Sequence, residues 1–165
     1  MKKAGLMFLA LMISVLVGFA NRAEAGSIMI SVAEFTADGD TDTGPGTYLK
    51  SFDGGYLTGS IPRPCLVAPV RIPGNATKIN KVIVYLIDDG TAPVDPWFQL
   101  DAINMATGDV DNYTAGVVTT GTDTVQGIEL PLLKQKLVKG RVYQLGTCLS
   151  GGQFLYGAKV VYTVP

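Results

Sequence analysis

Three aspartates at alternate positions form the densest group of potential metal ligands in the chain. Asp38, Asp40 and Asp42 lie in a glycine-containing stretch, and carboxylates spaced in this way can converge on a hard cation such as Ca²⁺. The stretch is not an EF-hand loop, because Thr43 stands at the sixth position, where glycine is required, and Leu49 stands at the twelfth in place of glutamate. A solvated acidic turn between two strands is the favoured interpretation. We therefore expect no cofactor, with a structural calcium as the alternative.

The residues needed for common enzyme chemistry are scarce. The chain has no histidine, although histidine is the commonest general base and the commonest transition-metal ligand. It contains no Ser-His-Asp set, zinc-ligand spacing, phosphate loop or nucleophile elbow. Beyond the first 25 residues only two glutamates occur, Glu34 and Glu129, so a two-carboxylate glycosidase would depend on a separation that the sequence does not supply. We expect a protein that is not an enzyme.

Aromatic side chains offer a different chemistry, namely stacking against the apolar faces of sugar rings. Trp97, Tyr48 and Tyr56 are the candidate ligand-binding residues. The competing interpretation of Trp97 is packing over one end of the core, because it follows Pro96 where a loop enters a strand. These aromatic rings make a carbohydrate-binding module one of the candidate functions.

The two cysteines, Cys65 and Cys148, stand at the ends of strand-like runs. In an exported chain an even number of cysteines indicates a disulfide. This bridge would close a loop of about 80 residues and stabilise the fold by about 4–5 kcal/mol in the chain-entropy model. Two separate buried thiols are the alternative, and a catalytic or metal-binding cysteine would have no histidine to accompany it.

The first 25 residues have the three-part layout of a secretory signal peptide. Lys2 and Lys3 give a positive start, Gly5 to Ala20 form a short apolar run, and Ala23-Glu24-Ala25 places small residues at both cleavage-determining positions. The run is shorter than the roughly 20 residues that span a bilayer, so an uncleaved anchor is the weaker alternative. We expect cleavage after Ala25, a secreted domain over residues 26–165 in the periplasm or outside the cell, and no membrane span after cleavage.

The charge of the mature chain excludes two classes of partner. Without the leader the chain keeps ten basic and thirteen acidic residues. A mildly acidic domain with scattered Lys and Arg has no electrostatic footprint for nucleic acid and no polybasic segment for anionic lipid. The partners that remain are a second copy of the chain, which would give a homo-oligomer, and a glycan of the cell surface or extracellular space.

Glycine and proline interrupt runs of β-branched and aromatic residues about every ten residues, a spacing typical of short antiparallel strands. Apolar residues alternate over 65–72 and 153–164, and the apolar run 82–87 predicts a central strand covered on both faces. Further strands are expected at 27–35, 48–52, 56–60, 98–105, 115–120, 125–132 and 142–149, and residues 132–139 have room for one helical turn. These patterns predict one all-β domain, an antiparallel β-sandwich of the jelly-roll type with about 8–10 strands.

Two stretches of the chain carry a family resemblance. One is Cys65-Leu-Val-Ala-Pro-Val-Arg-Ile-Pro-Gly-Asn-Ala-Thr, followed by a strand that ends in Tyr85-Leu-Ile-Asp-Asp, and the other is the closing strand Leu155-Tyr-Gly-Ala-Lys-Val-Val-Tyr. They resemble a group of uncharacterised exported bacterial β-sandwich domains. The resemblance covers residues 60–162 and departs at Phe98-Gln-Leu-Asp, where the group often carries arginine. It implies the fold and export, and it assigns no functional residue because the group has no assigned chemistry.

The sequence thus predicts a non-enzymatic secreted β-sandwich that acts as a surface or matrix component through binding or self-association. A carbohydrate-binding module, with or without a structural calcium, is the alternative. The strand expected at 27–35 begins almost at the mature terminus. Such a strand can pair inside its own domain or complete a neighbouring copy by strand addition.

Overall fold

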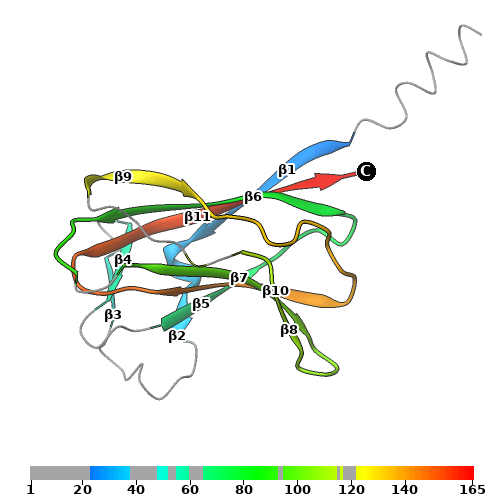
Figure 1. The fold of residues 1–165 in the computed structure, drawn as a ribbon, viewed down its shortest axis with the longest axis horizontal. Helices are drawn as coiled ribbons and strands as arrows, with labels where there is room; N and C mark the ends of the chain where they lie inside the picture. Colours follow the sequence, from blue (N-terminus) through cyan, green and yellow to red (C-terminus); the bar gives the residue numbers. More distant parts are fainter. Residues whose placement is uncertain are drawn as a thin grey trace, which may run out of the picture.

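The computed structural model describes residues 23–37, 48–51, 55–59, 65–92, 95–114, 116 and 122–165. In this part of the chain nearly all regular structure is β-strand, and Figure 1 shows the strands arranged in two layers. The described residues include no helix that is long and apolar enough to cross a membrane.

Each layer is an antiparallel sheet. In the first, the order is β3 (Tyr48–Ser51), β4 (Tyr56–Gly59), β11 (Gln153–Val164), β6 (Lys78–Asp88) and β9 (Thr122–Glu129), and β1 (Glu24–Ser31) pairs with the far end of β11. In the second, the order is β2 (Thr36–Ala37), β5 (Cys65–Val70), β10 (Arg141–Cys148), β7 (Trp97–Asn104) and β8 (Val110–Asn112). They are called the six-stranded and the five-stranded sheet below.

The connections between the sheets identify the jelly roll. From β4 onward the chain passes back and forth, with only β7 and β8 following each other in the same sheet. The resulting orders, β4-β11-β6-β9 facing β5-β10-β7-β8, are those of two interleaved Greek keys. The predicted fold class, a single all-β sandwich of the jelly-roll type, is confirmed.

The core lies between the two sheets and follows from the alternation read in the sequence. Along β6 the side chains of Val82, Val84 and Leu86 are buried, whereas the alternate residues Ile83 and Tyr85 are half-buried on the outer face. Other fully buried side chains come from strands of both sheets: Leu57, Leu66, Phe98, Leu100, Leu145 and Leu155. The run 82–87 is thus a central strand, but its outer face is not as deeply covered as expected.

The segment before β10 differs from the expected helical turn at 132–139. Leu132 and Lys136 form isolated β-bridges, to Thr114 and Lys78. Two tyrosine hydroxyls bind its backbone: Tyr113 donates to the carbonyl of Lys136 at 2.8 Å, and the amide of Val138 donates to the hydroxyl of Tyr143 at 2.9 Å. Because these long-range partners satisfy the backbone groups, the segment gains little from a helical turn.

Other differences concern strand bounds and short elements. The strand β9 begins and ends three residues before the expected 125–132, and β6 extends beyond the expected run 82–87 at both ends. The strands β2 and β8 are too short to show an alternating pattern, and the sequence did not predict them. The strand expected at 115–120 lies outside the described residues, apart from residue 116.

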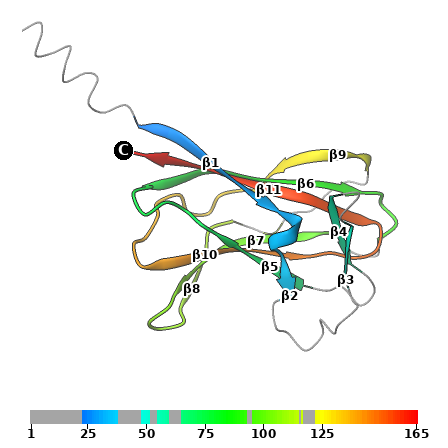
Figure 2. The same cartoon turned by 180° about the vertical axis from the view of Figure 1, so that it is seen from behind.

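The N-terminal strand β1 pairs along β11 of its own domain, beside the C-terminus (Figure 2). It begins at Glu24, before the expected cleavage point, and ends at Ser31, earlier than predicted. There the Ser31 side chain accepts a hydrogen bond from the amide of Ala33, and the Glu34 carboxylate accepts one from the amide of Ser31. This capping box starts a short 3-10 turn over Val32–Glu34 and so terminates the strand.

Candidate functional site

The predicted disulfide between Cys65 and Cys148 is present. Cys65 begins β5 and Cys148 ends β10, and the two residues are direct partners in the antiparallel ladder, with Cα atoms 4.1 Å apart. The bond therefore ties together the two strands whose outer face carries the hollows described next.

The indole ring of Trp97 lies across the outer face of the five-stranded sheet. The next residue, Phe98, is fully buried, so Trp97 points away from the core. A Cβ atom placed on Gly116 would come within 2.8 Å of indole Cδ1, and one placed on Gly146 within 3.4 Å of indole Cζ3. The indole ring thus occupies the space that side chains at positions 116 and 146 would need. The Trp97 side chain remains partly exposed on this outer face, and an aromatic ring in such a position can stack against an apolar surface.

A hollow of about 230 Å³ opens beside this ring and is called the Trp97 hollow. Its lining comes from β5, β7 and β10: Cys65, Leu66, Val67, Trp97, Asp101, Gln144, Gly146 and Thr147. Gly146 stands in the middle of a central strand, and its lack of a side chain leaves room for both the ring and the hollow.

The carboxylate of Asp101 is the ionisable group of the Trp97 hollow. Asp101 is only 9% exposed although it lies on an outer face, and its Oδ1 accepts a hydrogen bond from Gln99 Nε2 at 2.7 Å. Burial raises the pKa of this carboxyl, and the hydrogen bond from Gln99 partly opposes that rise. No cationic side chain of the described residues forms an ion pair with it. A nearly buried carboxylate without a cationic partner is costly, and such groups are frequent in binding sites.

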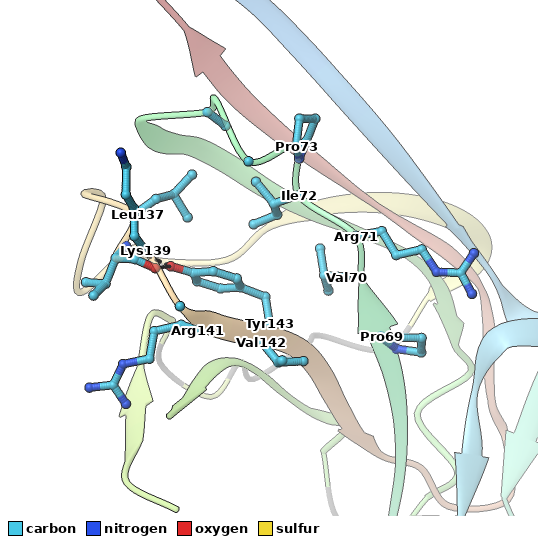
Figure 3. A pocket seen from close by; sticks show the side chains of 14 residues that line it. Pro69, Val70, Arg71, Ile72, Pro73, Leu137, Lys139, Arg141, Val142 and Tyr143 are labelled. Carbon is cyan, nitrogen blue, oxygen red and sulfur yellow. Dashed lines mark hydrogen bonds between the residues drawn. The ribbon is translucent and has the colours of Figure 1, made fainter. Parts of the chain in front are cut away.

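A second hollow, of about 420 Å³, lies at the end of the β5–β10 pair and is called the basic groove. Figure 3 shows Ile72, Leu137 and Tyr143 around its interior, whereas the charged end of Arg71 extends away from it on one side and those of Lys139 and Arg141 extend away on the other. The groove thus combines an apolar interior with a cationic rim.

The three cations of the basic groove differ in their partners. Arg141 donates to the backbone carbonyl of Asp109 at 2.9 Å and pairs with Asp111 at 3.3 Å. The same carboxylate binds Lys134, and chiefly this hydrogen bond lowers the pKa of Asp111. Neither Arg71 nor Lys139 forms an ion pair with any carboxylate of the described chain.

The structure does not bring the predicted aromatic residues together. Tyr56 begins β4 and lies on the outer face of the six-stranded sheet, with its ring 5.2 Å from that of Phe154 and 6.0 Å from that of Tyr156. Tyr48 pairs through its backbone with Gly59 in the same sheet. Trp97 belongs to the other sheet, so Trp97 and Tyr56 face opposite sides of the sandwich and cannot share one binding platform.

A third hollow, of about 530 Å³, lies on the same outer face and is lined in part by Tyr156. Its lining includes Met29 of β1, Tyr85 of β6 and Val125 of β9. Met29 and Val125 are 61% and 51% exposed, so the outer face of the six-stranded sheet presents apolar side chains to solvent.

The proposed calcium ligands Asp38, Asp40 and Asp42 lie outside the described residues. Elsewhere in the chain, Asp88 and Asp89 each accept hydrogen bonds within their own turn, and the bonds from Thr91 lower the pKa of Asp89. Within the described ranges, no three His, Cys, Asp or Glu residues lie close enough together to hold a metal ion.

Asp101, Gln144 and the basic groove were not found from the sequence. The one available signal for Asp101 was a charged residue next to the apolar Leu100 in an expected strand. The groove gave no signal, because it depends on the loop after β5 meeting the segment before β10, about 65 residues later in the chain.

A scan against protein-family models finds no match for this chain, and a search of curated proteins also finds none. Among solved structures, the chain is similar to the Podospora anserina GH26-CBM35 β-(1,4)-mannanase, with a TM-score of 0.46 and 15% sequence identity. The match covers 87% of this chain and 29% of the mannanase, so the chain spans less than a third of that protein. A likeness of this degree carries no argument about function, and the fold assignment rests on the strand order.

Proposed function

We propose that the chain is a non-catalytic binding domain that works outside the cytoplasm and binds a glycan on the outer face of its five-stranded sheet. The observation that carries the proposal is that the ring of Trp97 and the nearly buried carboxylate of Asp101 line one hollow. The ring offers a stacking surface for the apolar face of a sugar. The Asp101 carboxylate accepts hydrogen bonds from sugar hydroxyls, and the amide of Gln144 both donates and accepts them.

Two observations support work outside the cytoplasm. The disulfide between Cys65 and Cys148 fits an oxidising compartment, because cytosolic cysteines are kept reduced. The leader pattern of residues 1–25 supports the same compartment independently.

The composition of the Trp97 hollow supports a binding role without catalysis. Asp101 is the one ionisable side chain among the described residues that line it, since Cys65 is held in the disulfide. Glycoside hydrolysis commonly uses two carboxyl groups on either side of the scissile bond, and nucleophilic catalysis needs an activating base.

The test is a binding titration of the processed protein against a panel of soluble polysaccharides. Trp97→Ala should lower affinity by at least about tenfold, because it removes the stacking surface, and Trp97→Phe should retain part of it. Tyr56→Ala is the matched control, since it removes an aromatic ring from the opposite face and should leave binding unchanged. The proposal fails if Trp97→Ala binds every ligand as tightly as the unaltered protein.

Self-association is a second candidate, and it rests on the six-stranded sheet. In the described chain β1 pairs only with β11, and its residue Met29 is 61% exposed beside the third hollow. An edge strand with apolar surface beside it can pair with a second copy. Light scattering over a concentration range should show a growing mass that Met29→Glu abolishes, and a constant monomer mass would contradict this candidate.

A further inference from the structure

The Trp97 hollow and the basic groove follow each other along one strand pair. Pro69 of β5 lines the groove, and its ladder partner Gln144 of β10 lines the Trp97 hollow. The next outward pair is Val67 with Gly146, which lies under the indole ring. The linings of the two hollows share no residue, but they come next to each other at the Pro69–Gln144 pair.

Basic residues are concentrated at the groove end of this strand pair. Residues 71–78 and 134–141 contain six of the ten basic residues of the mature chain and no acidic residue. Two backbone hydrogen bonds make the segments neighbours. The amide of Ile79 donates to the carbonyl of Gln135 at 2.7 Å, and the amide of Leu137 donates to the carbonyl of Thr77 at 2.9 Å. Two basic segments that are far apart in the sequence thus lie together near the C-terminus (Figure 1).

Only part of this positive charge is paired with carboxylates of the described residues. Asp111 offsets Lys134 and Arg141, whereas Arg71 and Lys139 are exposed and form no ion pair with a described carboxylate. Two such cations at the rim of an apolar hollow attract an anionic group, and a guanidinium can bind a carboxylate or sulfate through two parallel hydrogen bonds.

We propose that the two hollows are consecutive subsites of one cleft and that its ligand is an acidic polysaccharide, one that carries carboxylate or sulfate groups. The inference rests on the glycan-binding function proposed above. One sugar stacks on Trp97, and the anionic groups of sugars further along the chain reach Arg71 and Lys139. Arg71 directly follows β5 and is four residues beyond Val67, a distance of about 13 Å at the usual rise of an extended chain, so the cleft fits an extended polysaccharide rather than a single sugar.

The position of Asp101 fits this arrangement. Its ladder partner is Gln144, so its carboxylate lies in the Trp97 subsite and not at the basic rim. There it accepts hydroxyl groups, while the anionic substituents bind at the other end. The cleft therefore orients the polysaccharide chain along the β5–β10 pair.

The experiment compares acidic polysaccharides with neutral counterparts of the same backbone. Polygalacturonate, alginate and chondroitin sulfate are each titrated beside a form whose acid groups have been esterified or removed. We expect tighter binding of an acidic form than of its counterpart, with an advantage that shrinks as salt is added. Arg71→Gln and Lys139→Gln should each weaken binding of the acidic form by up to about fivefold, the scale of an exposed ion pair, and leave the neutral form unaffected. Lys159→Gln, on the six-stranded sheet, is the matched control.

The outcomes separate this inference from the proposed function. If the protein binds acidic and neutral forms equally and Trp97→Ala loses this binding, the preference for an acidic polysaccharide is wrong and the glycan-binding function stands. Binding that depends on Arg71 and Lys139 but not on Trp97 would overturn both the shared cleft and the proposed function. Failure of the protein to bind any of the polysaccharides would also overturn both. Equal affinity for duplex DNA or for phosphatidylglycerol vesicles would show a general polyanion surface and overturn the acidic polysaccharide.

Discussion

The six-membered ring of Trp97 rests on Gly146, in the middle of the central strand β10. Glycine weakens a strand because it has no side chain to pack and loses more backbone freedom on folding than other residues. Here it leaves the space that the indole occupies. The local cost of Gly146 and the position of the Trp97 ring therefore belong to one arrangement.

Gly146→Val tests that arrangement. A valine at this position would push the indole off the sheet, while its β-branched side chain suits the strand. We expect binding of a polysaccharide ligand to fall by at least about tenfold with little loss of stability. Gly127→Val, which displaces Tyr85 on the opposite sheet, is the control and should bind normally in the same titration. Unchanged binding in Gly146→Val would show that the flat ring is not needed.

The strands were predictable wherever the alternation of apolar and polar residues was long. The closing strand β11 has the predicted bounds, and β5, β7 and β10 lie within two residues of theirs. The same patterns failed at Val110–Asn112, where three residues cannot display a period of two. They also allowed a helical turn at 132–139 that does not form, since the backbone of that segment is bound by the hydroxyls of Tyr113 and Tyr143.

The disulfide should account for a large part of the stability. Its residues are 83 positions apart, and the bond restricts the unfolded chain, an effect of about 4–5 kcal/mol for a loop of this length. Reduction with dithiothreitol, or Cys65→Ala with Cys148→Ala, should lower the free energy of unfolding by about 2–5 kcal/mol in urea titrations. The double variant should no longer respond to dithiothreitol. Equal midpoints with and without reductant would contradict the prediction.

Gly157, the glycine of β11, should not tolerate a side chain. It has φ = 145°, and a Cβ atom there would lie 2.8 Å from the carbonyl oxygen of Ile30. Gly157→Ala therefore strains the backbone and separates β1 from β11, at a cost of about 1–3 kcal/mol. Gly151→Ala meets no atom within 4 Å, so it should leave the unfolding midpoint nearly unchanged. Similar midpoints for the two variants would argue against this packing.

The candidate site was less predictable than the fold, because side chains from different sheets look alike in a sequence. Trp97 and Tyr56 are both aromatic residues at the start of a strand, and both were selected for that reason. Only the topology shows that β7 and β4 lie in different sheets, so that the two rings face opposite ways. The partners of Trp97, namely Gly146 and Asp101, become visible only through the ladder between β7 and β10.

Asp101 should affect both the pH dependence of the unfolding free energy and the affinity for a polysaccharide. Burial raises its pKa, so the folded protein holds this proton more tightly than the unfolded chain does. The ionised carboxylate therefore costs stability, and the cost is absent below the unfolded value near pH 4 and fully present above the raised folded value. Asp101→Asn removes the cost, so its gain in unfolding free energy over the unaltered protein should be larger at pH 7 than at pH 3 in urea titrations.

The same substitution should weaken binding of a polysaccharide by about tenfold, since a neutral amide oxygen accepts hydrogen bonds less strongly than a carboxylate. A residue that lowers stability and raises affinity is the trade-off expected of a binding site. Asp123→Asn, an exposed carboxylate on the edge strand β9, is the control and should alter neither property. If the stability gain of Asp101→Asn is equal at both pH values, or if its affinity matches that of the unaltered protein, Asp101 has no such role.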